Sequence, residues 1–193
     1  AVVGMLEEDD GLIFNAAVLC GPSGLVASYR KVHLPYLGVD RFTTPGDTAF
    51  AVHDVGGLRV GLHICYDCSF PESARVMSLA GADLLILPTN FPSGAACMVE
   101  HVVHTRAMEN AVYFAAIIGF QFIGQSKICG PDGKPLAAAD SVEEKMLLAD
   151  VDPTLARQKR CIRVPGKHEI DRFLDRRPEF YGPIVEANRL PRA

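Results

Sequence analysis

The sequence lacks tryptophan, and its 19 Lys and Arg residues form no long run. Asp and Glu outnumber them at 23, which gives a net charge of -4 at pH 7. No basic surface is therefore expected to hold a phosphate backbone, which argues against a nucleic acid partner. No apolar stretch reaches the roughly 18 residues that a membrane-spanning helix needs, so no membrane partner is expected either.

A targeting segment is also missing at the start of the sequence. The apolar residues 1–6 are followed at once by Glu7-Glu8-Asp9-Asp10, unlike a signal peptide. The six cysteines are mostly spread singly through apolar segments, which is typical of reduced thiols rather than of a disulfide framework. We therefore expect a cytoplasmic protein. The chain opens in a strand-like run without an initiator Met, and we expect it to lack its N-terminal part.

What the sequence does contain is a series of short, apolar, β-branched runs separated by turns. At 193 residues the chain fits one domain with a substantial core. Strands are expected at residues 2–6, 14–20, 26–29, 50–55, 59–65, 84–88, 112–118, 122–128, 134–138 and 145–151, and helices at 71–80, 95–111 and 153–159. Residues 14–29 and 122–138 read as antiparallel hairpins. This order predicts a layered α/β fold.

Residues 59–73 place a cysteine at a turn from a strand into a helix. An apolar run ends at Cys65, a polar turn follows, and Pro71 opens the helix. Backbone N–H groups point outward at such a turn and the helix dipole favours negative charge, so the position suits a thiolate nucleophile. The backbone N–H of Tyr66 offers one donor to an oxyanion. A core cysteine is the other interpretation.

Lys31 stands at the end of another expected strand, just before Pro35 forces a loop. A lone Lys at such a position is most often a solvated surface charge. If Lys31 instead points into a pocket beside Cys65, its ammonium group can stabilise a developing oxyanion and a thiolate. The two residues together then predict nucleophilic catalysis.

Two further patterns suggest rival chemistry. Cys65 and Cys68 have the C-x-x-C spacing of a redox dithiol, in which the second thiol resolves a mixed disulfide formed by the first. Cys97, His101 and His104 fall on one side of the second expected helix, with a spacing that metal ligands use. The H-E-x-x-H order of metalloproteases is missing there, so we interpret this stripe as solvated or interface-facing and expect no metal.

Four segments carry a resemblance to a known family: YRKVHL at 29–34, GLHICYD with FPE at 61–72, LPTNFP at 87–92 and RAMEN at 106–110. Taken in this order, they resemble the carbon–nitrogen hydrolase (nitrilase) superfamily, in its amidase and carbamoylase branches. The resemblance covers nearly the whole chain, but only about the C-terminal two-thirds of a family domain. Its most specific part is the second segment, which is similar to the family's nucleophile turn.

The resemblance implies a role for individual residues. Cys65 is the implied nucleophile and Lys31 the implied catalytic lysine, while Asp40 stands where many relatives carry a second glutamate. The implied substrate-binding residues are Tyr66, Asn90 and Phe91. The family's general base is a glutamate upstream of the first strand, and this sequence has no counterpart. The link between Ile118 and Gln121 is also shorter than the family's usual loop.

The fold that the resemblance implies is a four-layer α-β-β-α sandwich of nitrilase type, without its N-terminal strand–helix portion. A single domain would cover residues 1–193, with 165–193 as a C-terminal extension. The implied reaction is hydrolysis of a non-peptide C–N bond in a small amide or N-carbamoyl substrate, through a cysteine thioester and without metal or cofactor. A homodimer or higher homo-oligomer is expected. The alternatives are an inactive binding or scaffold protein of this fold and a thiol–disulfide redox protein.

Overall fold

The computed structural model of the protein describes residues 1–119, 122–140 and 144–187. Part of the short link after Ile118, residues 120–121, thus lies outside the described residues. The chain divides into two compact units, Ala1–Gln158 and Lys159–Ala193. A single domain with an extension from residue 165 stays a prediction.

The first unit begins with an antiparallel sheet of three strands. Its order is β1-β2-β3, formed by β1 (Val2–Asp9), β2 (Leu12–Gly21) and β3 (Gly24–Arg30). Asp10 and Gly11 join the first two strands with φ angles of 50° and 76°, the left-handed values that a two-residue hairpin turn requires. The hairpin predicted over residues 14–29 is confirmed, because β2 pairs with β3.

A second sheet of six strands runs in the order β4-β5-β6-β7-β8-β9. The strands are β4 (Val52–Val55), β5 (Leu58–Leu62), β6 (Leu84–Thr89), β7 (Tyr113–Ile118), β8 (Lys127–Cys129) and β9 (Pro135–Ala138). The three central strands are parallel and the outer ones antiparallel. The predicted hairpin within residues 122–138 is confirmed, although its first strand starts only at Lys127. The strand expected at 145–151 is wrong, since this stretch forms no strand.

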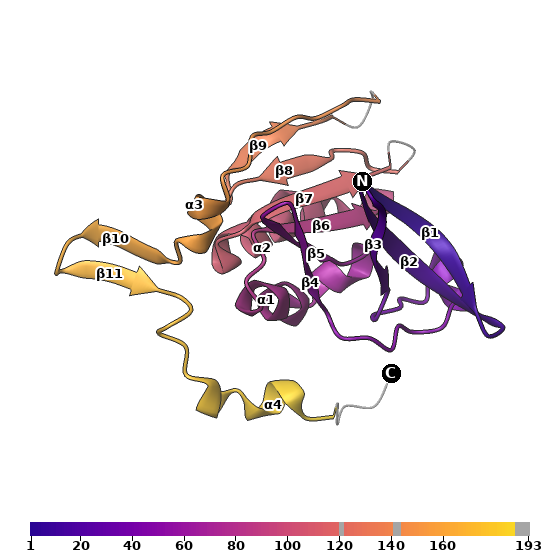
Figure 1. Ribbon diagram of the computed structural model, residues 1–193, viewed down its shortest axis with the longest axis horizontal. Helices are drawn as coiled ribbons and strands as arrows, with labels where there is room; N and C mark the ends of the chain where they lie inside the picture. Colours follow the sequence, from indigo (N-terminus) through magenta and orange to yellow (C-terminus); the bar gives the residue numbers. More distant parts are fainter. Residues whose placement is uncertain (120–121, 141–143, 188–193) are drawn as a thin grey trace. The chain divides into compact units, whose positions relative to one another are not determined.

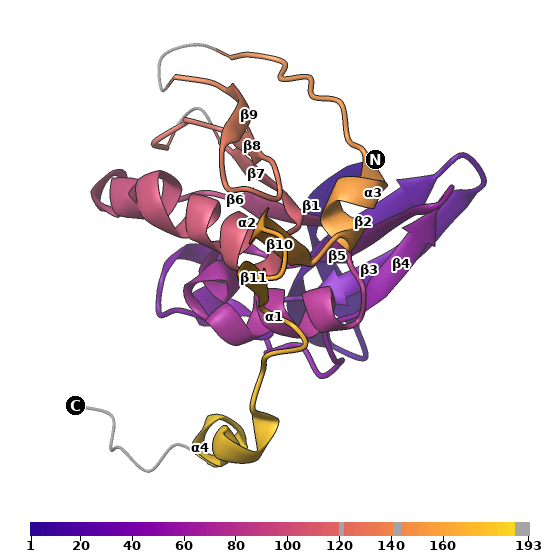
Figure 2. The same ribbon diagram turned by 90° about the vertical axis from the view of Figure 1, so that its left-hand side faces the viewer.

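The parallel strands are connected by helices that cover one face of the six-stranded sheet. These are α1 (Pro71–Leu79) and α2 (Val103–Asn110), and Figures 1 and 2 show both on the side of the sheet away from β1–β3. Met77 of α1 and Val103 of α2 are fully buried in one core cluster with Leu85 of β6. This is the packing that an α/β fold needs to bury an apolar sheet face.

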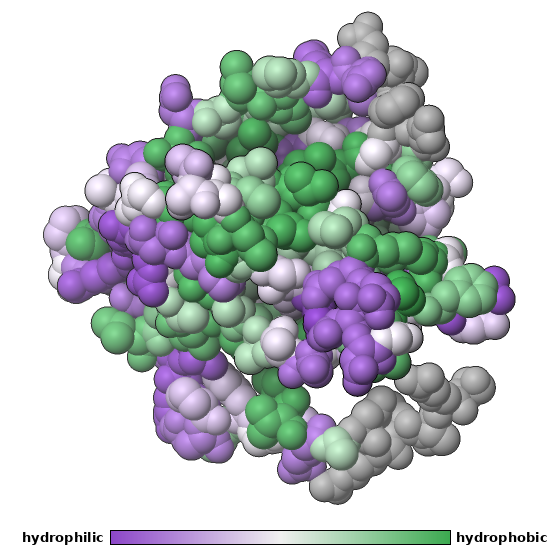
Figure 3. Space-filling view, turned by 45° about the vertical axis from the view of Figure 1, so that its right-hand side comes forward, coloured by the Kyte–Doolittle hydropathy of each residue, from purple (hydrophilic) through white to green (hydrophobic). Residues whose placement is uncertain are grey.

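The three-stranded sheet covers the opposite face of the larger sheet (Figure 2). Leu19 and Tyr29 pack there against Leu62 in a second core cluster. Helices and two sheets together confirm the α/β class and supply three layers of the predicted sandwich. The other face of the small sheet leaves Val3 and Met5 about half exposed, at 54% and 49%. Figure 3, which brings this side forward, shows hydrophobic residues interleaved with polar ones.

The helix predicted over residues 95–111 is present at residues 96–110, but it contains a π-helical stretch. A short 3-10 turn, η3 (Ser93–Ala95), and a π-helical stretch, η4 (Met98–Val102), precede α2. A π turn inserts an extra residue into the helical ladder, which periodicity alone does not reveal. The predicted buried stripe is nevertheless present, since Val99 and Ala107 are fully buried. The helix ends at Asn110, and Ala111 after it has a left-handed φ of 47°.

The remaining elements are short. The first unit ends with α3 (Pro153–Arg157), and the second consists of a hairpin, β10 (Arg160–Val164) with β11 (His168–Asp171), followed by η5 (Pro178–Phe180) and α4 (Gly182–Val185). Within the second unit, the Lys159 ammonium lies 4.8 Å above the ring of Phe173. Among the described residues, no helix has the length and apolar character required to cross a membrane.

Candidate active site

The backbone takes a sharp turn where β5 ends, and Cys65 stands at this turn. The chain passes from Leu62 into a 3-10 helix, η2 (Cys65–Ser69), and then into α1. Cys65 has a φ of 47°, in the left-handed region that residues other than glycine rarely adopt, at a cost of roughly 1–2 kcal/mol. Its side chain is partly buried and lines a cavity. A strained backbone that presents a thiol to a cavity is typical of functional sites.

The carboxylate of Asp67, which is fully buried, holds the start of η2. Oδ2 accepts hydrogen bonds from the Ile64 N–H at 2.9 Å and the Tyr29 hydroxyl at 2.7 Å. Oδ1 accepts from the backbone N–H of His33 at 3.1 Å and lies 2.8 Å from its Nδ1. Burial alone would raise the pKa of Asp67, but the hydrogen bonds from His33, Ile64 and Tyr29 lower it below its ordinary value. Asp67 is therefore ionised in the folded protein at neutral pH.

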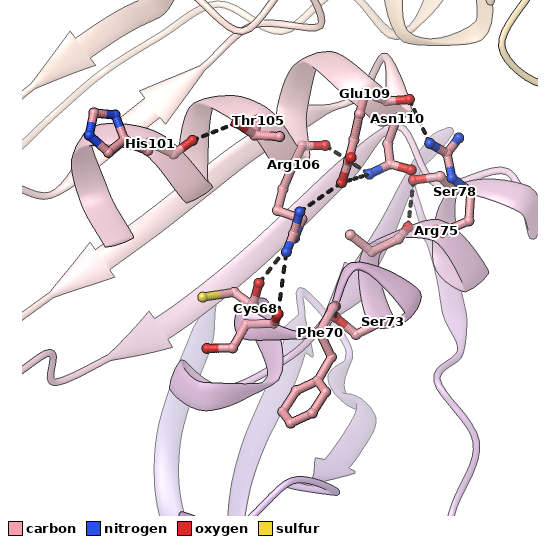
Figure 4. A network of polar contacts seen from close by, with 12 residues as sticks. Cys68, Phe70, Ser73, Arg75, Ser78, His101, Thr105, Arg106, Glu109 and Asn110 are labelled. Atoms are coloured by element: carbon pink, nitrogen blue, oxygen red, sulfur yellow. Dashed lines mark hydrogen bonds and ion pairs between the residues drawn. The ribbon is translucent and has the colours of Figure 1, made fainter. Parts of the chain in front are cut away.

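The other end of η2 is held by an arginine from α2. Arg106 is 8% exposed, and Figure 4 shows its guanidinium group reaching down to the turn. Nε donates to the carbonyl of Cys68 at 3.0 Å and Nη2 to that of Ser69 at 3.4 Å. Nη1 is 2.9 Å from the carboxylate of Glu109. A carboxylate and a guanidinium group thus fix the two ends of the turn.

Lys31 lies one residue beyond β3 and is almost fully buried, at 1% exposure. Its ammonium group forms an ion pair with Asp40, which belongs to the 3-10 helix η1 (Gly38–Phe42). The second oxygen of Asp40 accepts a hydrogen bond from Asn15 Nδ2 at 2.7 Å. A buried ammonium group needs such a counter-charge, because isolated charges are very costly to bury. Lys31 is therefore no solvated surface charge.

A cavity of about 770 Å³ brings these side chains together. Cys65, Lys31, Asp40 and Asn90 all line it, as the sequence led us to expect for a common site. Among the described residues that line it, Asp40 is the only carboxylate. Apolar residues, including Phe122, form much of the remaining wall. The volume and the mixed lining suit a small molecule held by a few polar groups.

Two of the predicted substrate-binding side chains lie away from the cavity wall. Phe91 is 3% exposed and packs in the core cluster beneath the helices. The side chain of Tyr66 is on the surface and meets the Phe70 ring edge-on at 5.1 Å, although the prediction for Tyr66 concerns its backbone N–H. Neither residue is part of the cavity lining, and the aromatic ring found there belongs to Phe122.

The rival sites find less support in the structure. Burial raises the pKa of Cys68 to about 12, so this thiol is poorly suited to resolve a mixed disulfide. In the part of the chain that the structure describes, no group of three or more His, Cys, Asp or Glu side chains could hold a metal ion. Cys97 and His101 are exposed, while His104 Nδ1 lies 2.7 Å from the carbonyl of Gly133.

The parts that Asp67 and Asn15 play in this arrangement were not foreseen from the sequence. One signal was available for Asp67. Tyr29 and His33 stand two residues before and two residues after Lys31, and alternate residues of an extended segment share a face. That spacing indicates a shared partner beside Lys31, but it does not say which residue this partner is.

Three of the proteins to which the chain is similar illustrate its relationship to known proteins. A protein named nitrilase from Pyrococcus abyssi (strain GE5 / Orsay) is 39% identical over 186 residues, which cover 93% of this chain and 68% of that protein. The omega-amidase of Homo sapiens is 35% identical over 164 residues, which cover 76% and 58%. A solved amidase from Nesterenkonia sp. AN1 is 26% identical with a TM-score of 0.79, covering 95% of this chain and 69% of that one.

The amidase from Nesterenkonia has also been solved as a glutamine-for-glutamate mutant in which acrylamide has added to the active-site cysteine. The present chain spans 58 to 69% of the length of these three relatives. The family model for carbon–nitrogen hydrolases matches residues 1–160, which include the turn at Cys65, Lys31 and the six-stranded sheet. On this match, and on the identity with its relatives, the chain belongs to the carbon–nitrogen hydrolase family.

Proposed function

We propose that this protein hydrolyses the C–N bond of a small amide or N-carbamoyl compound, with Cys65 as the nucleophile. The observation that carries this proposal is the shared cavity, into which a strained turn presents the Cys65 thiol beside the buried ammonium group of Lys31. A positioned thiol and a fixed cation are the parts that acyl transfer requires. The amidases among the relatives support the same class of reaction.

The proposed reaction proceeds in two steps. Cys65 Sγ attacks the carbonyl carbon, a C–S bond forms, and the carbonyl electron pair moves onto oxygen, where Lys31 and the Tyr66 N–H stabilise it. The C–N bond then breaks, and the amine leaves with the proton that the base took from the thiol. Water attacks the resulting thioester with the help of the same base, which releases the acid and restores the thiol.

The proton acceptor in this scheme is the family's glutamate, which has no counterpart in this sequence. Asp40, the only carboxylate among the described cavity-lining residues, is a poor base because it is engaged by Lys31 and Asn15. We assign to Asp40 the task of holding the Lys31 ammonium group in place through their ion pair.

The cellular setting belongs to the same proposal. The substrate is a small molecule, because the cavity of about 770 Å³ has room for little more. The cysteines of the described residues are free thiols, which agrees with a reducing cytoplasm. We further propose a homodimer or higher homo-oligomer, which would cover exposed apolar side chains such as Phe180 and Ile184.

The test measures ammonia release from primary amides and N-carbamoyl compounds by the full natural protein that carries this sequence. Cys65→Ala should lower turnover by about a thousandfold or more, whereas Cys68→Ala should keep it within about twofold. Mass spectrometry of quenched wild-type reactions should find an acyl group on Cys65. Turnover by Cys65→Ala would refute the assignment. An equal need for both cysteines would favour the redox protein, and unchanged ligand affinity without turnover would favour the scaffold.

A further inference from the structure

We infer that Asp67 is a positioning residue for the proposed reaction: its buried carboxylate binds the Cys65 turn to the Lys31 segment, so that both side chains face the cavity together. The inference rests on the proposed function, since it concerns the geometry of the same nucleophile. It assigns a task to an acidic residue that takes no part in the chemical steps and does not line the cavity.

The four hydrogen bonds to Asp67 come from both sides of Lys31 and from the residue directly before Cys65. Tyr29 and His33 lie two positions before and after Lys31, and together they supply three of the four hydrogen bonds. Ile64, directly before Cys65, supplies the fourth. A single carboxylate therefore connects the flanks of the lysine to the flanks of the nucleophile. Because it is fully buried, water does not compete for these bonds.

Only a carboxylate fits the donors at this place. Each oxygen accepts from a backbone N–H, Oδ1 from His33 and Oδ2 from Ile64. A backbone N–H can only donate, so an asparagine amide would set its NH₂ group against one of them whichever way it turned. The unmade hydrogen bond would leave a buried donor without a partner, which costs about 1–3 kcal/mol.

The same bonds maintain the unusual backbone at Cys65. The Ile64 N–H donates to the Asp67 carboxylate, and the Asp67 N–H donates back to the Ile64 carbonyl at 3.0 Å, so the turn is closed around Cys65. The His33 ring is stacked on Phe70 with 3.8 Å between ring centroids, which prevents it from swinging away. Without the carboxylate, the left-handed φ of Cys65 loses the side-chain hydrogen bonds that hold the start of the turn, and the turn is expected to relax.

Asp83 provides a matched control. It is also a fully buried carboxylate, and it accepts from the Arg59 N–H at 3.0 Å and from Arg157 Nε at 3.0 Å. Hydrogen bonds lower its pKa as well, although burial opposes this. It lies outside the cavity lining, at the opposite end of the parallel strands from Cys65. Asp83→Asn should therefore resemble Asp67→Asn in its effect on stability and differ from it in its effect on Cys65.

The experiment measures how fast iodoacetamide alkylates Cys65 in the folded chain from pH 5 to 10, by peptide mass spectrometry. This reaction forms a C–S bond and releases iodide, and it needs no general base from the protein. Asp67→Asn should slow the alkylation of Cys65 by about tenfold across this pH range, because a relaxed turn no longer presents the thiol to the cavity. Asp83→Asn should leave the profile unchanged, and Cys97 should react at one rate in all variants.

Tyr29→Phe keeps the inference testable if Asp67→Asn does not fold. It removes one of the four donors without adding another, and should slow the alkylation of Cys65 by about threefold at neutral pH. An unchanged rate in either folded variant would overturn the inference, as would equal losses of rate in Asp67→Asn and Asp83→Asn. If wild-type Cys65 reacted no faster than exposed Cys97, the proposed nucleophile itself would be refuted, which is a separate outcome.

Discussion

Two segments of this chain combine cysteine and histidine at short spacing, and only one of them forms part of a site. Residues 63–68 follow a parallel strand, while residues 97–104 run through the π-helical stretch into α2. In the first segment, Cys65 stands in a left-handed turn at a cavity. In the second, His101 is three-quarters exposed, and Figure 4 shows it along the helix from Arg106, with its ring directed away from the turn.

The two segments have similar residue types, and they differ in the residues that contact them from elsewhere in the chain. The turn at Cys65 is fixed by Asp67 on one side and Arg106 on the other. The helical segment has right-handed backbone angles at Cys97, and its histidines meet the solvent, or a backbone carbonyl and the ammonium group of Lys127. Reactive residue types thus become a candidate site where long-range contacts force the backbone to present them.

The sharpest way to break this comparison is to replace the two cysteines by serine. Cys65→Ser should lower amide turnover by about a thousandfold, because a serine hydroxyl ionises far less readily than a thiol in a site built for a thiolate. Cys97→Ser should leave turnover within about twofold. Steady-state ammonia release by the full natural protein measures both effects. Similar losses of turnover in the two variants would contradict the claim that only Cys65 belongs to the site.

A second comparison concerns the lysine of each region. Lys31→Met leaves Asp40 buried without its partner and should lower the free energy of unfolding by about 3–5 kcal/mol. Lys127, whose Nζ lies 3.0 Å from His104 Nε2, is only partly buried, so Lys127→Met should cost less than about 1 kcal/mol. Urea unfolding followed by circular dichroism measures both. Equal costs would mean that the Lys31–Asp40 pair is not buried as the structure shows.

A third comparison concerns buried His63 and exposed His101, which should affect the pH dependence of stability differently. Burial lowers the pKa of His63 to about 4, so the folded protein keeps it neutral while the unfolded chain protonates it below about pH 6.5. Its contribution is fully present above pH 6.5 and is lost as the pH falls to 4, about 3 kcal/mol in all.

This dependence is tested by measuring the free energy of unfolding of the wild type, His63→Gln and His101→Gln between pH 4 and 7.5. His63→Gln should remove most of the slope, whereas His101→Gln, at an exposed position, should retain the wild-type slope. A wild-type slope in His63→Gln would contradict the burial of this ring against Phe114.

The smallest expected effects concern the two fully buried thiols. Burial raises the pKa of Cys68 to about 12 and that of Cys129 to about 11, so both should resist alkylation in the folded protein. Cys68→Ala and Cys129→Ala should each cost about 1 kcal/mol of stability through lost packing and leave turnover within about twofold. A large loss of turnover confined to Cys68→Ala would revive the redox interpretation.

Local patterns in the sequence predicted the parts of the fold that local physics decides. Turn residues between alternating runs predicted the hairpin of β2 and β3. The apolar run that ends at Cys65, followed by Pro71, predicted a turn from a strand into a helix. The structure places Lys31 and Asp40 in one cavity with Cys65, while the catalytic roles that the resemblance implied stay predictions.

The rest depends on contacts between distant parts of the chain. Asp67 bonds to Tyr29, 38 residues earlier, and no local pattern announces such a partner. Phe91 was expected at the substrate and is instead part of the core. Its neighbour Asn90 lines the cavity, and the sequence of a loop does not say which of two adjacent side chains points inward. The strand expected at residues 145–151 had apolar residues but finds no partner strand, and β structure depends on pairing.

The left-handed turn at Cys65 also limits how this protein can evolve. Threonine serves as a nucleophile in other hydrolases, but its branched β-carbon makes a positive φ particularly costly. Glycine and asparagine tolerate this backbone and offer no nucleophile. Among nucleophilic side chains, only cysteine and serine therefore suit the backbone at position 65. A homologue with neither residue at this position would keep the fold and act as a binding protein.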